Sequence, residues 1–244
     1  MRRFFADSKN VSAGNIIIND KEQIHHIKDV LRLVPGDEVV IFDDNGREYS
    51  SIVEEILLTK VSFKVKENKK QVLPKEPQLV IACAIPKGPK MDDIIDKLSQ
   101  LGVDRVIPLL TERVVVKLDE RKKISRQVRW KKIALSSAKQ SQRNNIMAVG
   151  PVSDIGEALS SCKSFDLKLI PNLAGKRQSL KEVFNKGEPK NILVFIGPEG
   201  DFSPREIELA QKSGCIPVSL GSLVLRVDTA AISVASFIKL YAHH

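Results

Sequence analysis

Apolar and polar residues alternate along residues 15–67 in the way that is typical of half-buried β-strands. The stretch EVVIFDDNGREYSSIVEEI carries Asn45 and Gly46 between two strand-like runs, which is a strong hairpin signal, and KVSFKVKE follows as another alternating strand. Residues 21–33 (KEQIHHIKDVLRL) repeat instead with a helical period, and a proline–glycine pair ends the repeat. The pattern therefore predicts a small β-barrel with one helix.

The pattern changes after residues 68–77 (NKKQVLPKEP), a polar stretch with two prolines that is typical of a linker. Residues 78–85 form a continuous apolar run, as in a strand buried on both faces. Amphipathic segments over 90–102 and 124–143 predict helices. Further strand-like runs lie at 165–170, 191–196 and 215–220. Strands that alternate with helices predict a mostly parallel α/β sheet. We therefore expect an N-terminal domain over 1–70, a linker over 71–77 and a C-terminal domain over 78–244.

Composition narrows the class of protein. The 244 residues are 42% hydrophobic, which is enough for a folded core. No apolar stretch is long enough to span a membrane, and the N-terminus lacks the apolar core of a secretion signal. Three cysteines without a CxxC pair are typical of a reducing compartment, and the four histidines, in two adjacent pairs, lack metal-ligand spacing. We therefore expect a cytoplasmic protein that contacts no membrane and binds no metal.

The net charge of +9 is concentrated in one segment. Between Lys117 and Arg143, ten lysines and arginines are opposed only by Asp119 and Glu120. Such a segment is a footprint for phosphate backbones, although a solvated helix face has the same composition. Trp130 is its only aromatic residue, so the segment does not predict base stacking.

Candidate chemistry begins with residues 194–208, VFIGPEGDFSPREIE. An apolar run ends in Gly-Pro-Glu-Gly, and Ser203 followed three residues later by Glu206 is a capping-box signal for a helix. A strand, a tight turn and a capped helix explain the glycines structurally, but glycine also permits close approach of the backbone to a ligand. The stretch contains neither the GxGxxG fingerprint nor a P-loop. In open α/β sheets, ligands bind beyond the carboxyl ends of strands, where this turn is expected.

Residues 219–238, SLGSLVLRVDTAAISVASFI, repeat the sequence of strand, glycine turn and helix. The leucines around Gly221 are suited to wall an apolar slot whose backbone groups read an adenine. Arg226 comes just before the helix. It is either an ion-pair partner of Asp228 or Glu199, or a residue with a catalytic or phosphate-binding role.

Taken together, IGPEGDFSPREIE and LGSLVLRVDTA resemble the C-terminal signature of the 16S ribosomal RNA uridine-N3 methyltransferases, a family of the SPOUT superfamily. The segments MRRFF, HHIKDVLRLVPGD, PKGPKMDDIIDKLSQLGVDRVIPLLTERVVV and RWKKIALSSAKQSQR follow in the order that the family has, so the resemblance covers most of the chain. The sequence departs from the family pattern at Gln100, Asp201, Val227 and Asp228.

The resemblance implies an N-terminal PUA-like β-barrel for RNA and a C-terminal α/β methyltransferase domain whose mostly parallel sheet carries a trefoil knot. It implies a homodimer, S-adenosylmethionine as the methyl donor, and a uridine in the decoding region of 16S rRNA, in the small ribosomal subunit, as the target. Residues expected to bind the cofactor are Ile196, Gly197, Glu199, Gly200, Leu220, Gly221, Leu223 and Leu225. Residues expected to bind RNA are Arg2, Arg3, Lys87, Lys90, Arg129, Lys132 and Gln140.

The proposed chemistry sets further requirements. Uridine N3 carries a proton and becomes a nucleophile only as an anion, whereas the methyl group of a sulfonium is already activated, so alignment and charge stabilisation are needed and a metal is not. An arginine suits the stabilising role because it stays charged and planar, and the candidates are Arg226 first and Arg143 second. Glu199 or Asp201 is a candidate acceptor for the N3 proton, but either carboxylate could instead hold the backbone.

Two other functions remain open at this point. A ribose 2′-O RNA methyltransferase of the same superfamily would share the knot but usually has a different closing motif. A non-catalytic RNA-binding protein in ribosome assembly would explain the charge and the barrel but not the two glycine loops.

Overall fold

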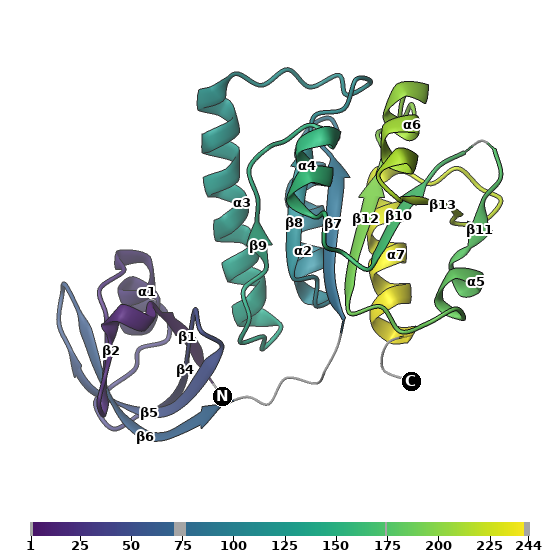
Figure 1. Ribbon diagram of the computed structural model, residues 1–244. Helices are drawn as coiled ribbons and strands as arrows, with labels where there is room; N and C mark the ends of the chain where they lie inside the picture. Colours follow the sequence, from purple (N-terminus) through teal and green to yellow (C-terminus); the bar gives the residue numbers. More distant parts are fainter. Residues whose placement is uncertain (1, 71–76, 174, 242–244) are drawn as a thin grey trace. The chain divides into compact units, whose positions relative to one another are not determined.

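The computed structural model describes residues 2–70, 77–173 and 175–241, and these residues form two compact units (Figure 1). The described residues up to Lys70 group with Ala138–Ile146, and the remainder of the described chain forms the second unit. Most of the predicted linker over 71–77 lies outside the described residues. Residues 68–70, which the sequence assigned to a linker, are instead the end of a strand.

The first unit is built on a six-stranded sheet. Its strands are β1 (Arg3–Ala6), β2 (Val11–Ser12), β3 (Asn15–Ile18), β4 (Glu38–Asp43), β5 (Arg47–Ile56) and β6 (Val61–Lys70), in the order β1-β4-β5-β6-β3-β2. A short 3-10 helix, η1 (Ser8–Asn10), precedes β2. Among the described residues of this sheet, the β1–β4 pair alone is parallel, and the long β5–β6 pair carries two register shifts, which bend its strands. The sheet curls around an apolar core that includes Ile16, Ile41 and Phe63.

The predicted hairpin at Asn45 and Gly46 is confirmed. Gly46 has a φ of 72°, a left-handed conformation that glycine adopts without strain. The buried Asp43 side chain holds the turn, because its Oδ1 accepts hydrogen bonds of 2.9 Å from the backbone nitrogens of Asn45 and Arg47. Its Oδ2 accepts the hydroxyl of Tyr49. Local sequence therefore fixed this turn.

The predicted helix over 21–33 is shorter and less regular than its periodicity suggested. It consists of α1 (Lys21–His25) and a π-helical turn, η2 (His26–Val30). Arg32 then adopts a φ of 51°, which ends the helix before the proline–glycine pair is reached. The change of hydrogen-bond pattern lets Leu33 return to the core, where it is buried.

The second unit contains a seven-stranded sheet in which every pairing is parallel. Its strands are β7 (Gln78–Ala84), β8 (Arg105–Leu109), β9 (Ala148–Val149), β10 (Leu167–Pro171), β11 (Gln178–Ser179), β12 (Asn191–Ile196) and β13 (Ile216–Ser219). Their order is β11-β13-β10-β12-β7-β8-β9. The predicted parallel α/β architecture is confirmed. The order also places β10 between β13 and β12, although β10 comes before both of them in the sequence.

Helices cover both faces of this sheet. They are α2 (Lys90–Gln100), α3 (Glu120–Gln140), α4 (Ile155–Ser161), α5 (Leu180–Phe184), α6 (Pro204–Lys212) and α7 (Val227–Tyr241). Helices α2 and α7 pack together on one face, whereas α4 and α6 pack together on the other (Figure 1). Helix α3 begins four residues earlier than predicted and ends at Gln140, so Arg143 lies beyond its end.

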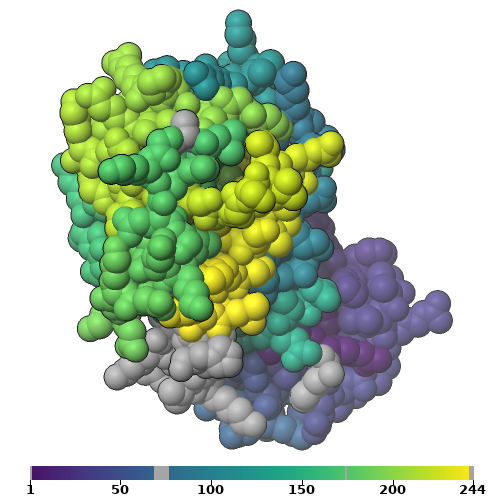
Figure 2. Space-filling model, turned by 90° about the vertical axis from the view of Figure 1, so that its right-hand side faces the viewer, coloured from purple at the N-terminus to yellow at the C-terminus, as the bar shows by residue number. Residues whose placement is uncertain are grey.

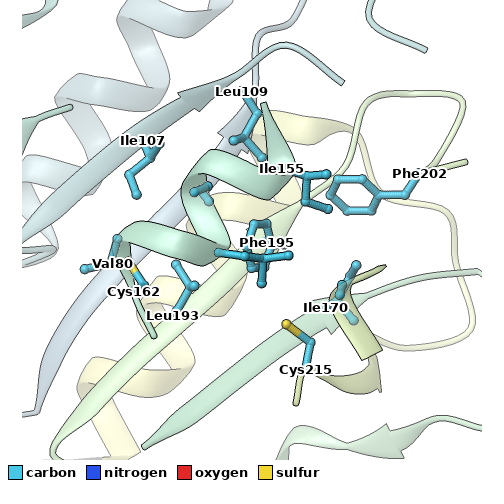
Figure 3. Packing of buried hydrophobic residues seen from close by; sticks show 14 residues of the cluster. Val80, Ile107, Leu109, Ile155, Cys162, Ile170, Leu193, Phe195, Phe202 and Cys215 are labelled. Atoms are coloured by element: carbon cyan, nitrogen blue, oxygen red, sulfur yellow. The ribbon is translucent and has the colours of Figure 1, made fainter. Parts of the chain in front are cut away.

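A continuous apolar core lies between the sheet and the pair α4 and α6. Val80 and Ala82 of β7, together with Leu193 and Phe195 of β12, face this side. Figure 3 shows the ring of Phe202, from the loop that precedes α6, pointing toward Ile155 of α4 and completing the core. The start of α6 is therefore anchored by packing as well as by its cap.

Candidate functional site

A pocket lies beyond the carboxyl ends of the neighbouring strands β10, β12 and β13. Its volume is about 570 Å³, including the open space at its mouth. Residues from the three loops that follow these strands line it, together with the first turns of α7. Figure 2 shows the face where the segment after β10 (green) adjoins the segment after β13 (yellow). This is the edge at which parallel sheets bind ligands.

Seven of the eight residues predicted to bind the cofactor lie together in this pocket. The lining includes Ile196, Gly197, Glu199, Leu220, Gly221, Leu223 and Leu225. Gly200 is not among the lining residues. A side chain at Gly200 would meet only Arg113, at an ordinary contact distance of 3.7 Å. Their role in binding stays a prediction, but the structure brings the two glycine loops together as the sequence interpretation requires.

The loop after β12 is held rigidly by its own side chains. Asp201 has a φ of 62°, its Oδ1 accepts the backbone N–H of Phe202 at 2.8 Å, and its Oδ2 accepts that of Leu173 at 2.9 Å. Gly197 packs closely against the Phe202 ring, because a Cβ at this position would lie 3.1 Å from the ring and would force it to shift. Asp201 therefore holds the backbone, one of the two roles that the sequence left open.

The capping box predicted for α6 is confirmed and does more than cap the helix. Ser203 and Glu206 are both buried, and each accepts a hydrogen bond from the other's backbone nitrogen. Glu206 Oε1 also accepts the backbone N–H of Glu112, in the loop after β8, at 3.0 Å. From the same loop, Arg113 Nη1 donates to the Gly200 carbonyl oxygen at 2.6 Å. The loop after β8 therefore supports the turn that carries Glu199.

The loop after β13 presents leucines to the pocket and an arginine beside it. Gly221 has a φ of 119°, which an L side chain rarely adopts, so this position needs glycine. Leu223 is 77% exposed at the pocket's mouth. Arg226 precedes α7 and is exposed, and its guanidinium makes no hydrogen bond or ion pair with any residue that the structure describes. The predicted ion pairs of Arg226 with Asp228 or Glu199 are absent from this described set.

The sequence interpretation missed the third wall of the pocket. Asn172 and Arg177, from the loop after β10, both line it, and Arg177 Nη1 donates to the Asn172 carbonyl oxygen at 3.0 Å. The Asn172 side chain is buried, and its Oδ1 has no hydrogen-bond partner among the described residues. The signal was a polar glycine-containing stretch, PNLAGKRQS, directly after an apolar run.

Cys83, near the end of β7, is buried, and negative charges at this edge of the sheet affect its thiol. Burial, together with the smaller effects of the negative charges of Asp228 and Glu199, raises the pKa of its thiol to about 12. The thiol is therefore protonated and unreactive, while both carboxylates lie near the same point of the sheet. Among the described residues, no group of three or more histidine, cysteine or acidic side chains is arranged to hold a metal.

The predicted RNA-binding residues of the first unit occupy different environments. Arg2 is half exposed and lies 3.7 Å from Asp37. Arg3 is nearly buried, pairs with Glu48 at 2.6 Å, hydrogen-bonds Asn144 and covers the ring of Phe42. These contacts give Arg3 a structural role, and its contact with RNA stays a prediction.

The predicted site residues Gln140 and Arg143, at and just beyond the end of α3, also occupy different environments. Gln140, which ends α3, is exposed, whereas its neighbour Lys139 is largely buried and donates to Gln23. Burial lowers the pKa of Lys139. Arg143 is half-buried, and its carbonyl oxygen accepts a hydrogen bond from Arg3. Arg143 belongs to the first unit and Arg226 to the second, and a shared role of the two stays a prediction.

In the second unit, the predicted RNA-binding residues are exposed along α3 and at the start of α2. Lys87 and Lys132 are exposed, and Lys90 is half-buried at the first position of α2. Arg129 is exposed but paired with Asp92, to which its Nε donates at 2.9 Å. Trp130 is buried and donates to the same carboxylate, so the single aromatic residue of the basic segment is not available for stacking.

Known proteins resemble this chain over both units. A family model described as RNA methyltransferase domain matches residues 74–239, and one described as RNA methyltransferase PUA domain matches residues 18–70. The chain is 32% identical to the ribosomal RNA small subunit methyltransferase E of Bacillus subtilis, over 98% of this chain and 96% of that protein. It is 31% identical to the protein of the same name from Mesomycoplasma hyopneumoniae, over 95% of this chain and 96% of the relative.

Solved structures also resemble this chain over nearly its whole length. A Legionella pneumophila protein, in complex with the bound cofactor SAM, has a TM-score of 0.85 at 28% identity and covers 98% of this chain and 97% of its own. The ribosomal RNA small subunit methyltransferase E of Neisseria gonorrhoeae, bound to S-adenosyl methionine, has a TM-score of 0.84 at 24% identity, over 99% of this chain and 98% of that chain.

The fold and the family models define an RNA methyltransferase with an N-terminal PUA unit and a parallel α/β sheet, and membership of the SPOUT superfamily stays a prediction. The chain belongs to the ribosomal RNA small subunit methyltransferase E family. The predicted family and class of enzyme are therefore confirmed. The trefoil knot stays a prediction, because strand order does not state how a chain threads through itself.

Proposed function

We propose that this chain transfers a methyl group from S-adenosylmethionine to N3 of one uridine in 16S rRNA, in the decoding region of the small ribosomal subunit. The observation that carries the proposal is the meeting of two glycine loops in one pocket, at the carboxyl ends of the parallel strands β12 and β13, which flank β10. Family membership supplies the class of reaction and of substrate. The Legionella and Neisseria neighbours with bound SAM support the choice of methyl donor.

The pocket suits S-adenosylmethionine in shape and charge. The pocket is open to solvent at its mouth, so a ligand can enter from the surface, and the leucines after β13 offer an apolar wall for the adenine. Asn172 holds a buried amide oxygen without a described partner, as expected of a group that receives a donor from a ligand. Glu199 and Arg177 place opposite charges along the lining, which suit the cationic and carboxylate ends of the amino-acid moiety.

When bound, S-adenosylmethionine supplies a methyl group that its sulfonium has already activated. The chain must therefore align the uracil and stabilise the negative charge that develops when N3 loses its proton. Arg226 suits the second task, because its exposed guanidinium stands next to the pocket residues Leu225 and Val227 and has no described partner to neutralise it. We propose Arg226 as the residue that stabilises the uracil anion.

In this proposal, the exposed basic residues of α3 and of the segment that precedes α2 hold the RNA backbone. Lys132 and Arg129 lie on α3, and Lys87 precedes α2. Contacts of this kind position RNA without reading its sequence. The target base is recognised by shape and by exposure of the base, and a buried base must be extruded before it reaches the pocket.

We also propose that two copies of the chain form a homodimer in the cytoplasm. Leu223 and Val224 beside the pocket, and Leu240 near the end of α7, are between 67% and 77% exposed. A second copy would remove this apolar surface from water. No helix of the described residues is long and apolar enough to cross a membrane. Light scattering on the purified protein measures the mass directly, and a monomer at micromolar concentration would refute the dimer.

Calorimetry tests the proposed function first. The purified chain is titrated with S-adenosylmethionine, with NADH as a control ligand, and then incubated with small ribosomal subunits and labelled donor. We expect saturable binding of S-adenosylmethionine alone and transfer of label to 16S rRNA. Absence of both binding and transfer, also with subunits present, would contradict the proposal and favour a non-catalytic role in ribosome assembly.

A further inference from the structure

The two carboxylates of the loop after β12 differ in what surrounds them. Both oxygens of Asp201 accept backbone hydrogen bonds, from Leu173 and from Phe202. Glu199 is exposed and lines the pocket, and its carboxylate makes no hydrogen bond or ion pair within the described residues. Asp201 is thus committed to loop structure, whereas Glu199 can receive a proton without breaking any contact of the fold.

A third carboxylate lies nearby but is less suitable. Asp228, in the first turn of α7, has a buried Oδ1 without a described partner, and it is not among the residues that line the pocket. The effect of both Asp228 and Glu199 on the Cys83 thiol places these two carboxylates near the end of β7. Of the two, only Glu199 lines the space where a ligand can enter.

The charged groups around Glu199 come from four elements. Asp201 stands on the same loop, Arg177 lines the pocket from the loop after β10, and Arg113 reaches the neighbouring Gly200 carbonyl from the loop after β8. Asp228 stands on α7. Two cationic and two anionic groups therefore stand on the elements that form or support this part of the pocket wall. The pH profiles of Glu199 variants should therefore be compared with the pH profiles of variants at these neighbouring residues.

On this geometry, and resting on the proposed function, we infer that Glu199 accepts the N3 proton of the target uridine. The imide of uracil is a weak acid and is mostly protonated at neutral pH, so a positioned base that accepts the N3 proton in the transition state lowers the barrier to methyl transfer. The N3–H bond breaks and its proton passes to a carboxylate oxygen of Glu199. The electron pair left on N3 forms the bond to the methyl carbon, and the methyl–sulfur bond breaks with its pair remaining on sulfur. The proton then leaves Glu199 to water.

Single-turnover methylation of small subunits at saturating S-adenosylmethionine tests the inference across a pH range. The variants are Glu199→Gln and Glu199→Asp, with Glu188→Gln as a control at an exposed glutamate of the same unit. We expect Glu199→Gln to lose about 100-fold or more at pH 7, which is the usual scale for removal of a general base. Its rate should rise about tenfold per pH unit as the uracil ionises unaided, whereas Glu199→Asp should retain part of the activity.

Two further readouts separate proton transfer from a structural role. Glu199 also lines the cofactor pocket, so the affinity for S-adenosylmethionine, measured by calorimetry, should fall by up to about tenfold in Glu199→Gln, a loss that saturating cofactor offsets in the rate assay. Subunits assembled with 5-fluorouridine-substituted 16S rRNA should recover at least tenfold of the lost rate, because fluorine makes N3 more acidic. Recovery of this kind needs no pocket repair, so a merely structural defect would not produce it.

Three outcomes would overturn the inference. One is an equal loss at every pH and on both RNAs, and another is a loss of cofactor affinity as large as the loss of rate. The third is the same pH and fluorouridine signature in Asp228→Asn but not in Glu199→Gln, which would assign the proton to Asp228. Failure of the proposed function itself would look different, because the wild-type chain would then give no N3-methylated product.

Discussion

Arg113 and Gly200 are joined by a hydrogen bond of 2.6 Å, in which the guanidinium Nη1 donates to the carbonyl oxygen. Arg113 comes from the loop after β8, and Gly200 belongs to the turn after β12. Neither residue lines the pocket, yet the neighbours of Gly200, Glu199 and Asp201, both do. The shape of this pocket wall therefore depends on a residue outside the pocket.

Replacing Arg113 should weaken binding of the methyl donor without unfolding the protein. The hydrogen bond is exposed, so its loss should make the free energy of donor binding less favourable by about 1 kcal/mol. This change corresponds to a roughly fivefold rise in Kd. Calorimetry on Arg113→Ala and Arg113→Lys measures this, and lysine should restore part of the affinity. Arg205→Ala, an exposed arginine on α6, serves as the control. Unchanged affinity in Arg113→Ala would show that the turn holds its shape alone.

Two glycines of the candidate site should respond differently to alanine. Gly221 has a φ of 119°, so Gly221→Ala strains the leucine loop by about 1 kcal/mol or more and should weaken cofactor binding at least fivefold. Gly200 lies outside the lining and has room for a methyl group, so Gly200→Ala should bind within about twofold of wild type. Equilibrium dialysis with labelled S-adenosylmethionine compares the two, and a reversed order would refute the assigned loop geometry.

Glu206 should contribute strongly to stability because its buried carboxylate serves two backbone donors. Glu206→Gln leaves only one oxygen acceptor for the N–H groups of Ser203 and Glu112, and it should lower the free energy of unfolding by about 1–3 kcal/mol. Urea denaturation followed by circular dichroism provides the measurement. Glu208→Gln removes an exposed carboxylate of the same helix, paired with Lys212, and should change stability by less than about 1 kcal/mol. Equal effects of the two variants would argue against the buried network.

The basic face of α3 should act through phosphate contacts. Lys131→Ala removes an exposed charge and is expected to lower the slope of log affinity against log salt by about one, with little change in which RNA is preferred. Binding of small subunits at several salt concentrations gives the slope. Lys163→Ala, an exposed lysine outside α3, should leave it unchanged. A salt slope that Lys131→Ala does not alter would place the RNA elsewhere.

Features that depend on neighbouring residues could be predicted from the sequence. The turn at Gly46 and the capping box of Ser203 and Glu206 are fixed by local hydrogen bonds, and both form as expected. The predicted parallel sheet rests on the alternation of apolar runs with amphipathic helices, which is also read locally.

Features that depend on distant residues could not be predicted in this way. Asn172 and Arg177 join the pocket only because β10 lies between β12 and β13, and no local pattern states that order. The contacts of Arg3 with Glu48 and Asn144 likewise join residues that are far apart along the chain, so no local pattern predicts them. The resemblance to a known family supplied the ligand and the reaction, which periodicity does not contain.

The most direct test of the proposed function is the identity of the methylated nucleoside. Small ribosomal subunits from cells that lack this chain are incubated with the purified protein and S-adenosylmethionine, and the 16S rRNA is digested to nucleosides for mass spectrometry. We predict a single new product in which the uracil base, and not the ribose, carries the added methyl group at N3. A methyl group on the ribose, or no methylated nucleoside under conditions in which the protein binds S-adenosylmethionine, would contradict the proposed uridine-N3 methyltransferase.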